Sequence, residues 1–371
     1  MSVLIICEKP SVAKTVALAL GAAEQKDGYL SGNGLLVSWC IGHLISMADA
    51  GSYDERYKKW RYEDLPILPQ TWKYAPTPGK EKQLAVLKEL LHRSDVSEVV
   101  NGCDAGREGE LIFRFVYEQA GCTKPFSRLW ISSMEDSAIR EGFAGRRAGT
   151  EYDALYQSAL CRARADWLVG INATRLFSVL YHKTLNVGRV LSPTLNLLVE
   201  RAGKITMFHK EKYHIVHIGC GGVDAESERI SDASAADALK TACEASQAVC
   251  VSLKKEKKTA LPPKLFDLTL LQREANRVYG FTAKQTLDYA QSLYEKRFLT
   301  YPRTDSNYLT EDMAQTATDL VAALLPVLPF MQGAELTPEI GRVINSAKVS
   351  DHHAIIPTAA FAGNGFDGLP E

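Results

Sequence analysis

Two short apolar runs, each followed at once by acidic residues, constrain the fold of this chain most strongly. The first run is "VLIIC" at residues 3–7, followed by Glu8, and the second lies in "SEVVNGC", followed by Asp104. Short apolar runs bounded by turn residues are typical of buried strands in a parallel sheet. Helix-like segments follow both runs, at residues 11–21 and 108–121. This alternation predicts an α/β domain at the start of the chain.

The acidic residues after the two strands are candidate metal ligands. The carboxyl ends of parallel strands meet at one edge of a sheet, so Glu8, Asp104 and Glu108 are expected to lie close together. A hard cation relieves their repulsion, and Mg²⁺ prefers one or two carboxylates together with water or phosphate oxygens. The alternative is that each acid caps a helix and faces solvent. The sequence contains no Gly-x-x-x-x-Gly-Lys-Ser/Thr motif, so a P-loop ATPase is not supported.

The composition excludes several classes of protein. The net charge is −1, so only local clusters of basic residues can indicate nucleic-acid binding. The eight cysteines include no Cys-x-x-Cys pair, which argues against a zinc ribbon and favours a reducing, cytoplasmic environment. No apolar run approaches the roughly 20 residues that span a bilayer, so no membrane partner is expected.

The remainder of the chain changes character twice. Residues 151–203 have a helical pattern, with Ser192 predicted as an N-cap and Gly203 just past the helix end. Residues 213–222 and 247–258 look strand-like, and the chain is helical again from residue 264. Thr282 and Gln285 predict a capping box in this last part.

Seven sequence segments, in order along the chain, resemble the type IA DNA topoisomerases, and most closely their bacterial topoisomerase III branch. "CEKPSVAKTVALALG" and "DAGREGELIFRF" resemble the Toprim domain, and "RLWISSMEDSAIREGF" resembles its end. "RARADWLVGINATR" and "GRVLSPTLNLLVER" resemble the first part of the family's domain IV. "FLTYPRTDS" resembles the active-site tyrosine motif, and "DHHAIIPT" resembles a histidine motif.

The resemblance implies a multidomain α/β plus α fold, in which a Toprim domain is followed by the helical domains and partial β arch of an incomplete toroid. The implied domains are Toprim (1–150), the first part of helical domain IV (151–210), the outgoing strands of β-rich domain II (211–263) and helical domain III with the tyrosine (264–371). The chain stops in domain III, so a fragment or a truncated gene product that lacks the C-terminal part is expected.

The resemblance also implies catalytic roles. Tyr301 matches the tyrosine that becomes linked to the DNA 5′-phosphate, and Arg303 matches an arginine that holds the scissile phosphate. Lys9 matches a lysine that stabilises charge on the phosphate, and Glu8 matches a glutamate for proton transfer and metal contact. His352 matches a histidine that supports the tyrosine site.

In the metal motif, Asp104 matches the first acid and Glu108 the last, while Gly106 stands in place of the middle acid. We therefore expect one Mg²⁺ bound by Glu8 and Asp104 with Glu108 nearby. Whether Glu110 compensates for the missing acid stays open.

DNA-binding residues are expected in three places. Trp60 lies in "RYKKWRY", which interleaves basic and aromatic residues as a single-strand groove does, although a solvated surface loop is equally consistent with this pattern. By resemblance, the other positions are Arg162, Asp166 and Arg175 on a helix, and Asn186, Val187, Gly188, Arg189, Val190 and Leu191 in a loop.

These expectations define a Mg²⁺-dependent, ATP-independent type IA topoisomerase. It cleaves and reseals single-stranded or underwound DNA through Tyr301, relaxing or decatenating it as a monomer, with a helicase as candidate partner. The alternative is a truncated, non-catalytic remnant that binds single-stranded DNA. A Toprim nuclease or primase is a weaker third hypothesis, because neither requires "TYPRTDS".

Overall fold

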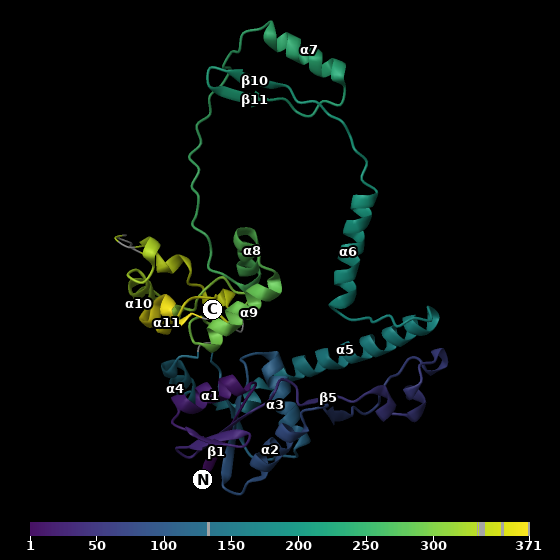
Figure 1. Cartoon of the computed structure of the whole chain (residues 1–371), viewed down its shortest axis with the longest axis vertical. Coiled ribbons are helices and arrows are strands. Elements are labelled where there is room, and N and C mark those ends of the chain that lie inside the picture. Colours follow the sequence, from purple (N-terminus) through teal and green to yellow (C-terminus); the bar gives the residue numbers. More distant parts are fainter. Residues whose placement is uncertain (132–133, 332, 334–337, 350–351, 370–371) are drawn as a thin grey trace. The chain divides into compact units, whose positions relative to one another are not determined.

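The computed structural model describes residues 1–131, 134–331, 333, 338–349 and 352–369 (Figure 1). The chain divides into two compact units. One unit contains residues 1–188 and 263–371, and the other contains residues 189–262.

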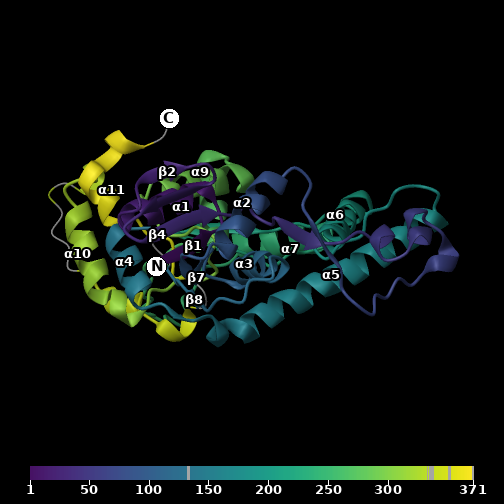
Figure 2. The ribbon, with the colours of Figure 1, turned by 90° about the horizontal axis from the view of Figure 1, so that it is seen from below.

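A seven-stranded mixed sheet forms the centre of the larger unit, with strand order β2-β3-β4-β1-β7-β8-β9. The labels β2, β4, β1, β7 and β8 follow this order in Figure 2. Strand β1 is parallel to both β4 and β7, and β7 is parallel to β8, whereas β2, β3 and β9 pair antiparallel. The strands are β1 (Ser2–Cys7), β2 (Glu24–Lys26), β3 (Tyr29–Gly32), β4 (Leu35–Trp39), β7 (Val96–Gly102), β8 (Phe126–Arg128) and β9 (Arg147–Ala148).

Helices cover both faces of this sheet, because its central strands are apolar on both sides. One core packs α2 (Glu81–His92), α3 (Arg107–Gln119) and the start of α5 (Asp153–Leu180) against the sheet. The other core contains α1 (Pro10–Ala19) and α4 (Asp136–Ala144). The predicted α/β domain is thus confirmed. A small separate hairpin pairs β5 (Ile45–Met47) with β6 (Tyr74–Pro76).

The second segment of the larger unit is helical, with α8 (Leu268–Tyr279), α9 (Ala283–Glu295), α10 (Ala314–Leu324) and α11 (Ala359–Asn364). The predicted capping box is confirmed at the start of α9, where Thr282 and Gln285 bond to each other's backbone N–H groups. A small core of Leu309, Ala317, Ala354 and Ile356 supports this segment. Tyr294 and Tyr301 instead belong to the core beside α1 and α4, so this segment packs directly on the α/β domain.

The smaller unit contains α6 (Leu191–Thr206), a hairpin of β10 (His217–Cys220) and β11 (Val223–Glu226), and α7 (Ala233–Glu244). Helix α6 corrects the predicted boundaries. It begins at Leu191, because the backbone N–H of Thr194 donates to Val190, and it passes Gly203, whose carbonyl oxygen accepts from Met207. The prediction of a strand at residues 247–258 is wrong, since these residues form no strand and the hairpin strands β10 and β11 pair only with each other among the described residues.

Among the helices of the described residues, none is both long enough and apolar enough to cross a bilayer.

Candidate active site

Tyr301 lies where the helical segment meets the edge of the sheet. Its hydroxyl donates a hydrogen bond to Oδ2 of Asp104 at 3.0 Å, although the two residues are 197 positions apart. The phenol ring lies 4.3 Å from the ring of His352 and 5.3 Å from that of Tyr294, measured between centroids. Tyr301 is only 9% exposed. Packing on several sides therefore fixes the hydroxyl against the carboxylate.

Lys9 and Glu8 come to the same place from the end of β1. The Lys9 ammonium nitrogen lies 3.7 Å from Oδ2 of Asp104 and 3.8 Å from Oε1 of Glu8. Burial and the nearby Asp104 charge raise the pKa of Glu8 to about 7, while Lys9 and Arg303 oppose this shift. A sizeable fraction of the Glu8 side chains therefore carries a proton at neutral pH.

The same surroundings keep the Tyr301 hydroxyl protonated. Burial, and then the Asp104 carboxylate, raise the pKa of Tyr301 well above its ordinary value, whereas Arg303 lowers it. The Arg303 guanidinium also donates to Oε1 of Gln291 at 2.8 Å. A phenol in this state attacks poorly, so any reaction at its oxygen needs added positive charge and a proton acceptor.

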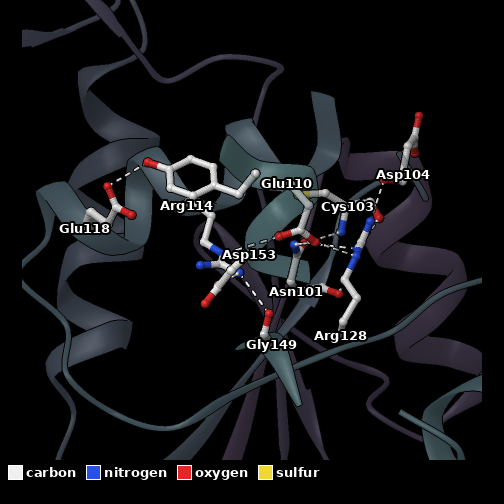
Figure 3. Close-up of polar contacts among 10 residues, drawn as sticks. Asn101, Cys103, Asp104, Glu110, Arg114, Glu118, Arg128, Gly149 and Asp153 are labelled. Atoms are coloured by element: carbon white, nitrogen blue, oxygen red, sulfur yellow. Dashed lines mark hydrogen bonds and ion pairs between the residues drawn. The ribbon is translucent and has the colours of Figure 1, made fainter. Parts of the chain in front are cut away.

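The loop that carries Asp104 is held from below by Arg128, which projects from the end of β8 (Figure 3). Its guanidinium donates to the carbonyl oxygens of Asn101 (3.0 Å), Cys103 (2.7 Å) and Asp104 (2.6 Å). Arg128 is 1% exposed, so these bonds form in a low-dielectric interior where they are strong. Sequence reasoning missed this residue, and the only signal was a basic residue in the otherwise apolar "RLW".

Glu110 neutralises Arg128 from the first turns of α3. Its carboxylate lies 2.8 Å from Nε of Arg128 and 3.3 Å from Nε of Arg114, and it accepts from Asn101 at 2.8 Å (Figure 3). Burial raises the pKa of Glu110, and the two arginine charges offset part of that shift. Arg114 also donates to the carbonyl oxygen of Gly149 at 2.9 Å. Glu110 is therefore a buried structural residue and does not replace the acid missing at position 106.

The close approach of α3 to the Asp104 loop depends on Gly109. A Cβ atom at this position would lie 2.0 Å from the carbonyl oxygen of Asp104. Only glycine permits this separation. Gly109 therefore allows the start of α3 to sit directly under the loop.

Several of the predicted DNA-binding residues line one cavity, away from Tyr301. Trp60, Asp166, Arg175, Asn186 and Val187 all line a cavity of ≈ 870 Å³. The Arg175 guanidinium lies 5.5 Å from the centroid of the Trp60 ring. It also donates a hydrogen bond to the carbonyl oxygen of Tyr57 at 2.8 Å. Helix α5 and this segment thus present an aromatic ring and a cation at one cavity.

Two family comparisons match these features. The Toprim domain family matches residues 3–134, and a DNA topoisomerase family matches residues 150–366, which is more than half of the 371 residues. The chain belongs to the type IA DNA topoisomerase family.

Curated relatives agree with this placement. The topoisomerase chain is 42% identical to DNA topoisomerase 3 of Shouchella clausii and 41% identical to that of Bacillus subtilis, over 95% and 96% of its length. It spans about half the length of these relatives, covering 50% of each. Full-length topoisomerase I of Thermotoga maritima has a similar structure, with 25% identity and a TM-score of 0.67 over 98% of this chain and 57% of that one.

The metal expected of a Toprim domain fits only part of the predicted site. Glu8 and Asp104 come together, but the Glu108 side chain is 61% exposed and lies 3.3 Å from Nε2 of His43. The His43 hydrogen bond lowers the pKa of Glu108. Within the described ranges no group of three His, Cys, Asp or Glu residues is placed to bind a metal. The expected position of Glu108 beside the other two acids is therefore not found.

The two carboxylates that do meet form a set that suits Mg²⁺. Burial, and then repulsion by Asp104, raise the pKa of Glu8, and a cation would remove the repulsion. Lys9 already lies within 3.8 Å of both and supplies positive charge. The site of Glu8 and Asp104 therefore suits a cation that takes two protein ligands and completes its coordination shell with water or phosphate oxygens.

The remaining predicted DNA-binding residues are dispersed. The Arg162 charge acts on Glu108 and lowers its pKa further, so Arg162 lies toward the edge of the sheet. Gly188 is the last residue of the first segment of the larger unit. Three residues belong to the smaller unit: Arg189, Val190 and Leu191, at the start of α6. Val190 and Leu191 are exposed.

Proposed function

We propose that this chain performs the strand cleavage and resealing of a type IA topoisomerase. The Tyr301 oxygen attacks a backbone phosphorus atom of single-stranded DNA, the bond to the 3′-oxygen breaks, and the tyrosine becomes joined to the 5′-phosphate. The reverse reaction restores both bonds. The observation that carries this proposal is the Tyr301 hydroxyl, which is held 3.0 Å from Asp104 beside Lys9 and Glu8.

The charges around Tyr301 support separate roles. Asp104 accepts the hydrogen bond of the Tyr301 hydroxyl, aligns its oxygen and would take up its proton as the oxygen attacks, while Arg303 favours the phenolate form. The Lys9 ammonium faces the same oxygen of Asp104 and would stabilise negative charge on the phosphate. Glu8, with its pKa raised to about 7, would donate a proton to the departing 3′-oxygen.

A bound Mg²⁺ would be held by Glu8 and Asp104 and would supply positive charge to the phosphate oxygens. No ATP is required, because the phosphotyrosine bond conserves the energy of the phosphodiester bond. The torsional strain of underwound DNA would then drive relaxation. Decatenation would use the same cleavage and resealing, with a helicase as a candidate partner that unwinds the duplex.

The substrate strand is proposed to pass through the cavity that contains Trp60 and Arg175. The exposed Trp60 ring suits base stacking whatever the sequence of the strand, and the buried Arg175 guanidinium beside it adds positive charge to the cavity. We retain the four-part division at residues 150, 210 and 263 as a proposal. In it the Toprim part supplies Glu8, Lys9 and Asp104, and the last part supplies Tyr301.

The second candidate is a single-stranded-DNA-binding protein without cleavage activity. It is favoured by Gly106, which removes one acid of the metal motif, and by Glu108, which contacts His43 instead of the other acids. Both candidates predict DNA binding, and only the first predicts a covalent product.

Covalent trapping separates the two candidates. The chain is incubated with a single-stranded oligonucleotide labelled at its 3′ end, which stays with the 5′-phosphate that joins the tyrosine, and with Mg²⁺, then denatured and resolved by electrophoresis. We expect a labelled adduct from the unaltered chain and from Tyr279→Phe, a change at an exposed tyrosine on α8. We expect none from Tyr301→Phe. Binding of the oligonucleotide without an adduct would favour the second candidate.

A further inference from the structure

A cavity of ≈ 580 Å³ lies on the larger unit, separate from the residues assigned to cleavage. One wall comes from Trp130, Ile131, Glu135 and the side of α4 that carries Ser137, Ala138, Glu141 and Gly142. The other comes from Thr300, the region of α10 and residues 353–359. Its volume is typical of sites for small organic ligands. Thr300 immediately precedes Tyr301, so one wall is continuous with the tyrosine segment.

The cavity wall is negative and apolar. Glu135, Glu141 and Asp312 line it, and no lysine or arginine does so among the described residues. The apolar surface includes Leu320 and the ring of Trp130. A wall of this kind favours a ligand that combines positive charge with a flat hydrocarbon body.

A buried histidine adds a second, independent polar feature. His353 lines the cavity and is 8% exposed, and burial lowers its pKa, which favours the neutral ring. Its Nδ1 lies 2.8 Å from the carbonyl oxygen of Ala354, so Nδ1 carries the hydrogen. Nε2 is then a hydrogen-bond acceptor, and within the described part of the chain it has no hydrogen-bond partner. A ligand with an N–H donor would satisfy it.

The two walls are already joined beside the cavity. Oε1 of Glu135 accepts from the backbone N–H of Ala359 at 3.0 Å. Asp136 on α4 also forms an ion pair with Arg297, which lies just after α9. A ligand in the cavity would add further contacts between α4 and the segment that contains Thr300.

From this geometry we propose that the cavity is a binding site for a small planar organic cation with N–H donors, such as an aromatic amidinium. The cation would lie between the carboxylates and Nε2 of His353, with its ring on the apolar wall. Bound there, it would connect α4 to the segment of Thr300. If the proposed cleavage function holds, the ligand would also resist movement of Tyr301 away from Asp104.

Calorimetric titration of the DNA-free chain tests the binding site. The probes are benzamidine and benzamide, which share a shape and differ in charge. We expect benzamidine to bind at least about tenfold more tightly than benzamide, because only it is a cation. The double variant Glu141→Gln/Asp312→Asn should weaken benzamidine binding by about tenfold, whereas Glu311→Gln, which removes the same kind of charge outside the cavity, should not. Equal binding of the two probes, or equal loss in Glu311→Gln, would overturn the proposal.

Hydrogen exchange tests whether the ligand contacts both walls of the cavity. Benzamidine should slow amide exchange in both residues 135–142 and residues 298–301, and protection of only one segment would refute bridging. Adduct formation by the unaltered chain is scored separately, so a failure of the cleavage proposal is distinguishable from a failure of this site.

Discussion

The buried carboxylate of Glu110 offers the sharpest test of how the Asp104 loop is supported. Glu110 and Arg128 are each 1% exposed, and Arg114 is 7% exposed. Glu110→Gln retains the size of the side chain but removes the countercharge of the buried Arg128 guanidinium, which cannot lose its proton. Arg114 loses one of its two partners and keeps Asp153 at 2.8 Å. Breaking a buried ion pair by changing one partner costs about 3–5 kcal/mol. This is a large share of the roughly 5–15 kcal/mol by which domains are stable.

Glu108→Gln is the matched control for this prediction. It makes the same chemical change two residues away on α3, where the side chain is 61% exposed and contacts only His43 among its ion-pair partners in the described residues. An exposed pair contributes at most about 1 kcal/mol. The two variants therefore differ in burial and in the partners they lose, not in the atoms that are replaced.

Urea denaturation followed by tryptophan fluorescence measures the difference. All five tryptophans lie between residues 39 and 167, so the signal reports on the α/β domain and α5. With a slope of about 1–3 kcal/mol per molar urea, Glu110→Gln should lower the midpoint by at least about 1 M. Glu108→Gln should change it by less than half as much. Equal midpoints for the two variants would refute the assignment of Glu110 as the support of this loop.

Three further predictions concern the cleavage and DNA sites. Gly109→Ala places a methyl group 2.0 Å from the Asp104 carbonyl oxygen, so it should lower the free energy of unfolding by about 1–3 kcal/mol and reduce adduct yield. Trp60→Ala should weaken single-strand binding by about 1–3 kcal/mol in an anisotropy titration, whereas Tyr62→Ala, outside the cavity, should not. Burial raises the pKa of Glu8 from 4.5 to about 7, so the folded state binds an extra proton between these values. The free energy of unfolding should therefore fall as pH rises from about 5 to 7, and Glu8→Gln should flatten that fall.

Local sequence patterns predicted the framework of the α/β domain well. The apolar runs before Glu8 and Asp104 are neighbouring parallel strands, β1 and β7, so their following residues share one edge of the sheet. The capping box at Thr282 was also predictable, because its partners are only three residues apart. These features depend on short-range patterns and on general rules of sheet topology.

Contacts between distant residues were not predictable from such patterns. Arg128 reaches three carbonyl groups of one loop, and no periodicity in the sequence indicates which backbone atoms a buried arginine will meet. Glu108 was expected beside the other acids, but a histidine from the loop after β4 pairs with it. The end of α6 was also predicted at the wrong residue. Gly203 lies inside the helix, where its carbonyl oxygen accepts a hydrogen bond from Met207, and does not end it.

Identification of the amino acid that becomes attached to DNA tests the central proposal most directly. The trapped product is digested with protease and nuclease, and the peptide that carries a nucleotide is sequenced by mass spectrometry. We predict a nucleotide 5′-phosphate on Tyr301, in the peptide that contains "FLTYPR", and its absence from every other tyrosine. Attachment at another residue, or DNA binding with no attached nucleotide under Mg²⁺, would contradict the account.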